Sequence, residues 1–382
     1  MKDDSRSAGH GLPSPHREAS PAKPGIIPHP SSLIPFMDTA LTSRPVTVQN
    51  PDDAIELCYT NGWTDGLPVV PATAERVRAM LAAGGVEPDK QVAFIENRQV
   101  SVTAEKVAIN AVMAGCKAEY MPVVLAAVDA LADPLYGYHG PATSTGGSAV
   151  FMVVNGPIAK KLDINSGNNL FGPGWRANAT IGRAVRLVMR NVIGTLPGSL
   201  DQSSLGHAGK YTFCIAENEV DSPWPAFHTT RGYKPDQNAV TIFAAYAPHQ
   251  YSNRLSATPE GVLDTACAHM RVSAGSGRQP QYAMVFAGEH QAIFKKAGWT
   301  REQVQKYAFE HSQATVAELK RANVIAGAVE AGDEKKPFPV VEGWQDLLVF
   351  AAGGLAGVQS CFIPGWGGKA GSQSVTKAIR LP

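Results

Sequence analysis

The sequence of 382 residues carries few charged side chains and almost no net charge. Charged residues make up 18% of it, and 34 Lys and Arg are balanced by 33 Asp and Glu. Because an average soluble domain carries about 25% charged residues, a large part of this chain must be buried. A net charge of +1 attracts neither nucleic acid nor acidic lipid, so we expect no nucleic-acid partner and no membrane partner.

Paired cysteines and long apolar runs are also missing. The five cysteines are scattered without a CxxC pair, which argues against a disulfide framework and a structural zinc site. No segment approaches about 20 consecutive apolar residues, and the N-terminal charges are not followed by the apolar stretch of a secretory signal. We therefore expect a cytoplasmic protein with reduced thiols. Low charge with 44% hydrophobic residues further suggests a homo-oligomer.

The commonest catalytic motifs do not occur either. The absence of HExxH and GxSxG patterns argues against zinc peptidases and serine hydrolases. The glycine-rich segment 165–178 is not a Walker A loop, so a nucleoside triphosphate is not expected. The sequence leaves the cofactor open.

What the chain does contain is an alternation of strand and helix patterns. Residues 148–155 form a nearly continuous apolar run, which is typical of a strand buried on both faces. Beyond residue 234, predicted strands at 239–245, 281–287 and 346–352 are separated by predicted helices. This order predicts an α/β fold with mostly parallel sheets flanked by helices.

Composition suggests three parts. Residues 1–46 are rich in Pro, Ser and His without apolar periodicity, so we expect a disordered tail. Two α/β lobes would follow. The first, at 47–235, would contain a cysteine elbow and a Gly/Asn-rich anion loop, and the second, at 236–382, would end in a glycine-rich loop.

Cys116 is the first candidate for chemistry. It follows a predicted helix at Ala104–Ala114 that Gly115 ends, and it stands just before the next helix. The dipole at a helix N-terminus favours a thiolate, and Lys117 adds positive charge. Glu119 could act as a base beside it. The alternative is a buried cysteine that behaves as a small apolar side chain.

The segment 165–178 is the second candidate. It joins asparagines and glycines to Arg176 and to the start of a long amphipathic helix, where free N–H groups can bind an anion. The alternative is a structural turn. Across this and the other candidate segments, we assign substrate binding to the following polar residues: Asn110, Thr143, Asn165, Ser166, Asn168, Asn169, Arg176, Asn178 and Asn218.

Two further candidates could move protons. His139 lies in a hydroxyl- and glycine-rich loop before the buried strand and could be a general base, or a loop histidine bound to backbone. Glu217 follows a predicted strand at 210–216, at the end where α/β folds bind ligands. Glu217 and Glu219 could also hold a divalent cation, or could be ordinary solvated charges.

A second glycine-rich loop, 353–357, follows the predicted strand 346–352. Ligands bind at this position in open sheets, and Gln359, Ser360 and Cys361 could line such a crevice. Residues 288–290 occupy the equivalent position after strand 281–287 and would lie close by if the two strands are neighbours. The loop 353–357 could equally well serve only in packing. Arg183, Arg186 and Arg190 recur at helical spacing, and we expect a solvated helix face there.

Four phrases resemble a group of bacterial proteins of unassigned activity: Asp65-Gly66-Leu67-Pro68, 108–116 (AINAVMAGC), 172–179 (GPGWRANA) and 216–219 (AENE). That group is associated with small proteins bearing a Sec/Thr-Gly-Ser-Cys motif, the UGSC (seleno)proteins. The resemblance covers most of residues 50–366 and implies redox or carbon–heteroatom chemistry beside a small thiol or selenol protein as partner. This chain itself has Gln359-Ser360-Cys361 in place of Gly-Ser-Cys, so the resemblance assigns it no catalytic residue.

We expect from these observations a thiol-dependent lyase, reductase or hydrolase acting on a small anionic metabolite. Cys116 would be its nucleophile or redox thiol, and His139 or Glu217 would move protons. One alternative is a non-catalytic metabolite-binding or scaffolding subunit of a thiol/selenol redox system. Another is a divalent-metal enzyme that uses Glu217 and Glu219. The thiol interpretation requires the 165–178 loop and the Cys116 elbow to open into one cavity.

Overall fold

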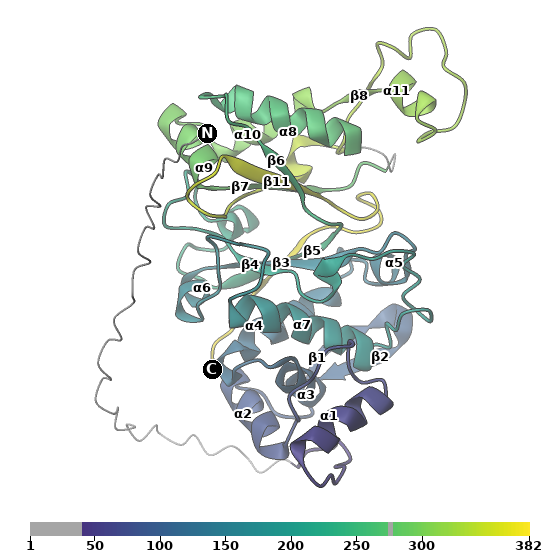
Figure 1. The fold of residues 1–382 in the computed structure, drawn as a ribbon, viewed down its shortest axis with the longest axis vertical. Helices are drawn as coiled ribbons and strands as arrows, with labels where there is room; N and C mark the ends of the chain where they lie inside the picture. The colour runs from purple at the N-terminus through teal and green to yellow at the C-terminus, as the bar shows by residue number, and fades with distance from the viewer. Residues whose placement is uncertain (1–39, 274–277) are drawn as a thin grey trace, which may run out of the picture. The chain divides into compact units, whose positions relative to one another are not determined.

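A computed structural model describes residues 40–273 and 278–382, and the chain from Thr39 to Pro382 forms one compact unit. Helices and strands alternate along it (Figure 1). The helices are α1 (Pro51–Thr60), α2 (Ala74–Gly84), α3 (Ala104–Ala114), α4 (Met121–Leu131), α5 (His139–Thr143), α6 (Pro157–Lys161), α7 (Arg176–Asn191), α8 (Pro259–Ser273), α9 (Gly288–Ala297), α10 (Arg301–His311) and α11 (Val316–Arg321). The strands are β1 (Gln91–Ile95), β2 (Val100–Thr103), β3 (Ala149–Asn155), β4 (Cys214–Ala216), β5 (Ala239–Ala245), β6 (His249–Ser252), β7 (Tyr282–Phe286), β8 (Ala314–Thr315), β9 (Pro337–Phe338), β10 (Leu347–Ala351), β11 (Gln359–Pro364) and β12 (Val375–Ala378).

Most of the predicted tail, residues 1–46, lies outside the described residues. Its described end is tied to the fold. The backbone N–H groups of Thr42 and Ser43 each donate a hydrogen bond of 2.8 Å to the carboxylate of Glu105. Glu105 is fully buried at the start of α3, so this part of the predicted tail is held in place.

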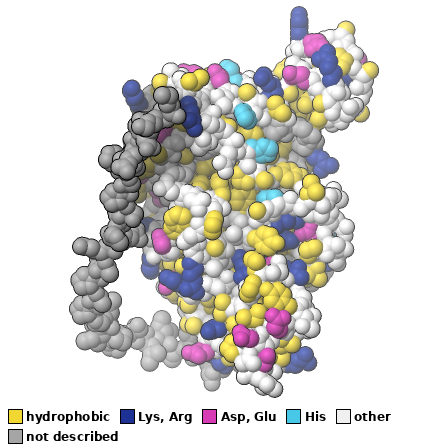
Figure 2. All heavy atoms as spheres, in the orientation of Figure 1, with side chains coloured by type: hydrophobic (Ala, Val, Ile, Leu, Met, Phe, Trp, Pro, Cys, Tyr) yellow, Lys and Arg dark blue, Asp and Glu magenta, His cyan; other side chains and the backbone are white. Residues whose placement is uncertain are grey.

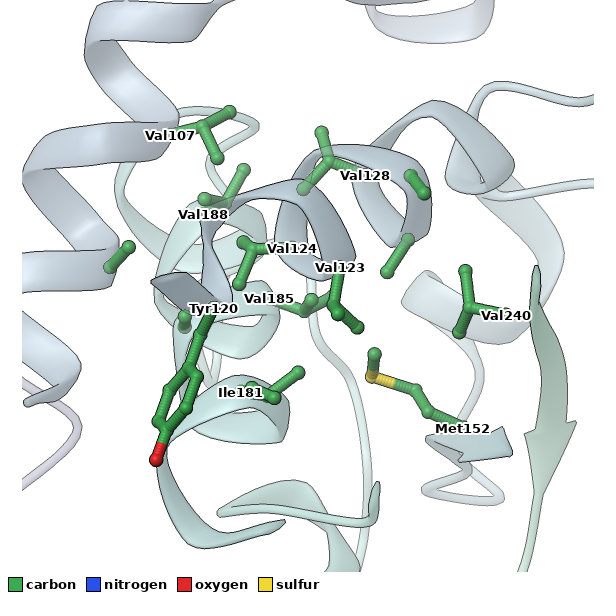
Figure 3. Packing of buried hydrophobic residues seen from close by; sticks show 14 of the residues in the cluster. Val107, Tyr120, Val123, Val124, Val128, Met152, Ile181, Val185, Val188 and Val240 are labelled. Carbon is green, nitrogen blue, oxygen red and sulfur yellow. The ribbon is translucent and has the colours of Figure 1, made fainter. Parts of the chain in front are cut away.

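The first sheet has the strand order β12-β5-β3-β4. Strands β3 and β4 run parallel, whereas β5 is antiparallel to both β3 and β12. Helices α4 and α7 pack on one face through apolar side chains that recur every three or four residues. Figure 3 shows Val124 of α4 beside Val185 and Val188 of α7, while Met152 of β3 and Val240 of β5 point into the same cluster.

The second sheet has the order β10-β7-β11-β6. Strands β10 and β7 are parallel, and β11 is antiparallel to both β7 and β6. Helices α8, α9 and α10 lie on one of its faces (Figure 1). Its other face shares an apolar cluster with the first sheet, which includes Phe151 of β3, Phe243 of β5 and Phe350 of β10. The core between the sheets is therefore continuous.

The predicted α/β class is confirmed, but the predicted mostly parallel sheets are wrong. In the described part of the chain both four-stranded sheets are mixed, and most strand pairings are antiparallel. The sequence patterns did not predict β6, β11 or β12, and each of these strands pairs antiparallel with its neighbours. Strands β6 and β12 have four residues each and lack a clear apolar pattern, so periodicity does not reveal them.

The two sheets are not formed by two consecutive halves of the chain. Strands β5 and β12 both come after residue 235 and both join the first sheet. Backbone hydrogen bonds of 2.8 Å also tie the end of β5 to the segment after β11, from Tyr246 N to Pro364 O and from Trp366 N to Ala244 O. The predicted boundary at residue 235 between two separately folding lobes therefore remains a prediction. Of the helices described, none is long and apolar enough to cross a membrane.

Candidate functional site

A cavity of about 420 Å³ lies where β7 and β10 end. In the space-filling view, hydrophobic side chains gather across the middle of the molecule at the level between β11 and β3 (Figure 2). The cavity is lined by residues of two loops and of three strands: Asn169, Leu170, Phe171, Gly172, Gln250, Val285, Ala287, Ala352, Gly353, Gly354, Gln359, Ser360 and Cys361.

Parallel pairing of β7 and β10 brings the segments that follow these two strands together beside the cavity. Residues 287–288 and 352–354 meet at one edge of the sheet, as the sequence analysis expected for neighbouring strands. Gly288 N donates to Gly354 O at 2.9 Å, and Gly353 N donates to Ser166 O at 2.8 Å. A Cβ atom on Gly354 would lie 2.1 Å from Asn168 Oδ1, so a larger residue there would require the Asn168 side chain to move.

Strand register decides which side chains face the cavity. Cys361 stands opposite Val285 and Gln250, and directly paired residues share one face of a sheet. Cys361 belongs to the apolar cluster between the sheets. Ser360 points to the other face, where its Oγ lies 2.7 Å from His290 Nδ1. The side chain of Cys361, not that of Ser360, is therefore directed toward the cavity.

The lining carries no charged side chain among the residues that the structure describes. Its polar groups are the amides of Asn169, Gln250 and Gln359, and Phe171 adds an aromatic ring that is 37% exposed. Arg176, expected to bind an anion here, is not part of the lining. Its Nε donates to Gly115 O at 2.9 Å. An anionic ligand in this cavity would therefore lack the predicted guanidinium partner.

Two asparagines of the 165–178 loop hold the loop itself. Asn165 Oδ1 accepts from Gly167 N at 2.8 Å. Asn178 Oδ1 accepts from Asn165 N at 2.7 Å, and its Nδ2 donates to Cys214 O at 3.0 Å. Both side chains are buried. The structural interpretation of the loop therefore fits these two residues. Asn169 also holds the loop, since its Nδ2 donates to Pro173 O at 2.8 Å, and it lines the cavity as well.

The Cys116 elbow contacts the start of α7, but its thiol is turned into the core. Sγ donates to Thr180 O at 3.3 Å, and the residue is 7% exposed. Burial raises the pKa of Cys116 to about 12, against small opposing effects of Thr180 and Arg176. Cys116 is not among the residues that line the cavity. This cavity therefore does not join the loop to the Cys116 thiol as the sequence analysis expected.

Thiol reactivity should follow this placement. At pH 8 a thiol of pKa about 12 is ionised in about one molecule in ten thousand, and the thiolate is the reacting form. We expect iodoacetamide to label half-buried Cys58 first and to leave Cys116 unmodified in the folded protein. Peptide mass spectrometry after timed labelling measures this. Labelling of Cys116 as fast as Cys58 would restore the elbow as a reactive site.

The other predicted residues of this region lie apart from the cavity. Glu119 pairs with Lys117 at 3.5 Å on the surface. Asn110 Nδ2 donates to a carbonyl of its own helix at 2.9 Å. His139 is exposed at the start of α5, and Thr143 Oγ1 donates to its carbonyl at 2.9 Å. The structure does not bring these residues together into one site.

Glu217 is completely enclosed and bound from several sides. Its carboxylate accepts from Asn155 Nδ2 at 2.7 Å, from Phe227 N at 2.6 Å and from Arg301 Nη2 at 3.0 Å. Burial raises the pKa of Glu217, while the Arg301 charge lowers it. Glu219 shares the Asn155 amide at 2.9 Å. These contacts join the end of the first sheet to α10.

Asn218 forms hydrogen bonds through both its backbone and its side chain. Asn218 N donates to Ala351 O at 2.7 Å, and its side chain caps the turn to Asp221. Within residues 40–273 and 278–382, no group of three or more His, Cys, Asp or Glu side chains is placed to hold a metal ion. Gln250 is a lining residue that the sequence did not suggest, because β6 was not predicted.

No protein-family model matches this chain, and no curated protein matches it.

Proposed function

We propose that this protein binds a small, largely uncharged metabolite in the cavity at the ends of β7 and β10. The observation that carries the proposal is the cavity itself. Its volume of about 420 Å³ falls in the range of about 300–1,000 Å³ typical of small-molecule sites. This corresponds to the metabolite-binding alternative of the sequence analysis rather than to an anion site built on Arg176.

The chemistry of the lining supports a neutral ligand. Leu170, Phe171 and Val285 provide apolar contact surface, and the amides of Asn169 and Gln250 can donate and accept hydrogen bonds. Taking an unpaired charge out of water into such surroundings is costly. A ligand with an apolar body and one or two hydroxyl, amide or carbonyl groups fits this distribution best.

Thiol-dependent catalysis is a second candidate, and we place it on Cys361 instead of Cys116. Cys361 faces the cavity and stands opposite Val285 and Gln250 in the sheet. Burial raises its pKa to about 12, so the thiol is protonated at neutral pH. This candidate predicts that Cys361→Ser abolishes turnover while leaving ligand binding intact.

A bulky side chain placed in the cavity from the edge strand β6 tests whether a ligand binds there. Gln250 is exposed on the edge strand β6, so Gln250→Trp should place an indole in the cavity without disturbing the core. We expect the purified wild-type protein, incubated with a metabolite extract, to show a one-to-one small-molecule adduct by native mass spectrometry. Gln250→Trp should reduce its occupancy about tenfold or more, since a bulky side chain occupies the ligand volume.

His249→Trp is the matched control. His249 is exposed on the same strand, points to the opposite face from Gln250 and does not line the cavity. Its variant should bind as the wild type does. A wild-type protein that retains no adduct from the extract, or equal occupancy in both tryptophan variants, would refute the proposal.

A further inference from the structure

We propose that the ligand of the cavity at the ends of β7 and β10 is a planar ring with an N–H group beside a C=O group, as in pyrimidinones and purinones. This inference rests on the proposed function and names the chemical class of its ligand. Gln250 of β6 and Gln359 of β11 would bind the polar edge of the ring, and Phe171 would stack on its face. All three residues line the cavity.

Strand register places the two glutamine carboxamides near each other. Gln250 stands directly opposite Cys361, and Gln359 precedes Cys361 by two residues on the same strand. Residues two apart point to the same face of a sheet, so both glutamines share the cavity-facing side with Cys361. Diagonal neighbours of this kind lie about 7–8 Å apart, within reach of long side chains. One small ring can therefore contact both carboxamides.

Both carboxamides are available to a ligand. Neither glutamine side chain forms a hydrogen bond with the residues that the structure describes. Other polar side chains of the lining are already engaged: Asn169 Nδ2 donates to Pro173 O at 2.8 Å, and Ser360 Oγ lies 2.7 Å from His290 Nδ1. The two glutamines are therefore the side chains best placed to select the polar groups of the ligand.

A carboxamide prefers a particular kind of edge. Its C=O accepts and its NH2 group donates, side by side in one plane. A bound ligand removes these groups from water, and a donor or acceptor left unpaired then costs free energy. A ketone or ether oxygen satisfies only the donor. A ring edge with N–H beside C=O pairs with both groups at once, as glutamine does with the adjacent donor and acceptor of adenine.

Phe171 provides a surface for the face of the ring. Its centroid lies 6.3 Å from that of Phe151 and 5.7 Å from that of Phe213. Phe151 belongs to β3 of the first sheet, whereas the two glutamines belong to the second sheet, so the ligand would lie between them. Stacking on an aromatic side chain favours flat heterocycles. Gly353 and Gly354, which also line the cavity, have no side chain to obstruct a flat molecule.

Uracil and 1,3-dimethyluracil, which share one ring, test this inference. Uracil carries N–H beside C=O, and methylation blocks both of its N–H groups. We expect isothermal titration of the wild-type protein to show saturable uracil binding, and binding of 1,3-dimethyluracil that is weaker by about tenfold or more, because a glutamine acceptor stays unpaired. Hypoxanthine, a larger ring with the same kind of edge, should compete with uracil.

Single substitutions assign the contacts. Gln250→Leu and Gln359→Leu should each weaken uracil binding about tenfold, since leucine neither donates nor accepts a hydrogen bond. Phe171→Leu should weaken it by a similar factor through lost stacking. The matched control is Gln345→Leu, because Gln345 is exposed and does not line the cavity. This variant should bind uracil as the wild type does.

The outcomes separate the ligand class from the proposed function. Equal affinity of the wild type for uracil and 1,3-dimethyluracil, or unchanged uracil binding in both glutamine variants, would overturn the inference. The wild type alone decides the first comparison, so it holds even if a variant fails to fold. If the metabolite extract yields an adduct that Gln250→Trp prevents, but uracil and hypoxanthine neither bind nor displace it, the ligand class is wrong and the cavity is still a binding site. If the wild type retains no adduct, the proposed function itself is wrong.

Discussion

Glu217→Ala is expected to lower the free energy of unfolding by about 3–5 kcal/mol, the usual cost of removing one partner of a buried ion pair. The substitution would leave Arg301, which is 8% exposed, without a counter-charge. It would also strip the hydrogen-bond acceptor from Asn155 Nδ2 and Phe227 N. Urea unfolding of the wild type and the variant at pH 7 measures the difference.

Glu219→Ala is the control that isolates the charge pair. Glu219 accepts hydrogen bonds from Asn155 Nδ2 at 2.9 Å and from Gly156 N at 2.7 Å, but it pairs with no cation in the described chain. Its loss should cost about 1–2 kcal/mol, as for ordinary hydrogen bonds. If both alanine variants lose the same stability, the Glu217–Arg301 pair contributes nothing beyond its hydrogen bonds, and our account of how α10 is held is wrong.

Helices were predictable because their signals are local. The helix expected at 104–114 is α3 (Ala104–Ala114), and Gly115 ends it with a φ of +89°. The strand expected at 239–245 is β5 (Ala239–Ala245). The strand expected at 210–216 is only Cys214–Ala216 in the structure, because residues 208–210 form a 3-10 turn instead.

Sheet topology was not predictable from the same signals. Strand β6 reads His-Gln-Tyr-Ser and β12 reads Val-Thr-Lys-Ala, so neither shows a strong apolar pattern. Each is a strand because a partner distant in sequence offers it a backbone ladder: β12 pairs with β5, and β6 with β11. Strand formation depends on such context more than helix formation does.

The candidate site was also predictable only in part. The sequence placed a glycine-rich segment directly after the strand expected at 346–352, and Gly353 and Gly354 of that segment line the cavity. The sequence left open whether Cys116 is reactive or buried, because the direction of a side chain at an elbow depends on tertiary packing, and the structure buries it against Thr180. The predicted solvated arginine row was wrong for the same reason. Arg183 binds Asp65 at 2.7 Å with only 13% of its side chain exposed.

Asp201→Asn should have the second large effect, lowering the free energy of unfolding at pH 7 by about 2–4 kcal/mol. The variant leaves Arg186 and Lys210 facing each other without a carboxylate between them. Burial alone would raise the pKa of Asp201, but hydrogen bonds from Lys210, Ser203 and Arg186 lower it well below its ordinary value.

This pKa shift fixes the sign of the pH dependence. An aspartate whose folded pKa lies below its unfolded value of about 3.9 contributes its full stability above that pH. The contribution is lost as the pH falls through the lower folded value. The stability difference between wild type and Asp201→Asn should therefore be constant from about pH 5 to 7 and shrink below about pH 4. Urea titrations across that range measure it, and a difference that grows on acidification would show that Asp201 is not held as the carboxylate.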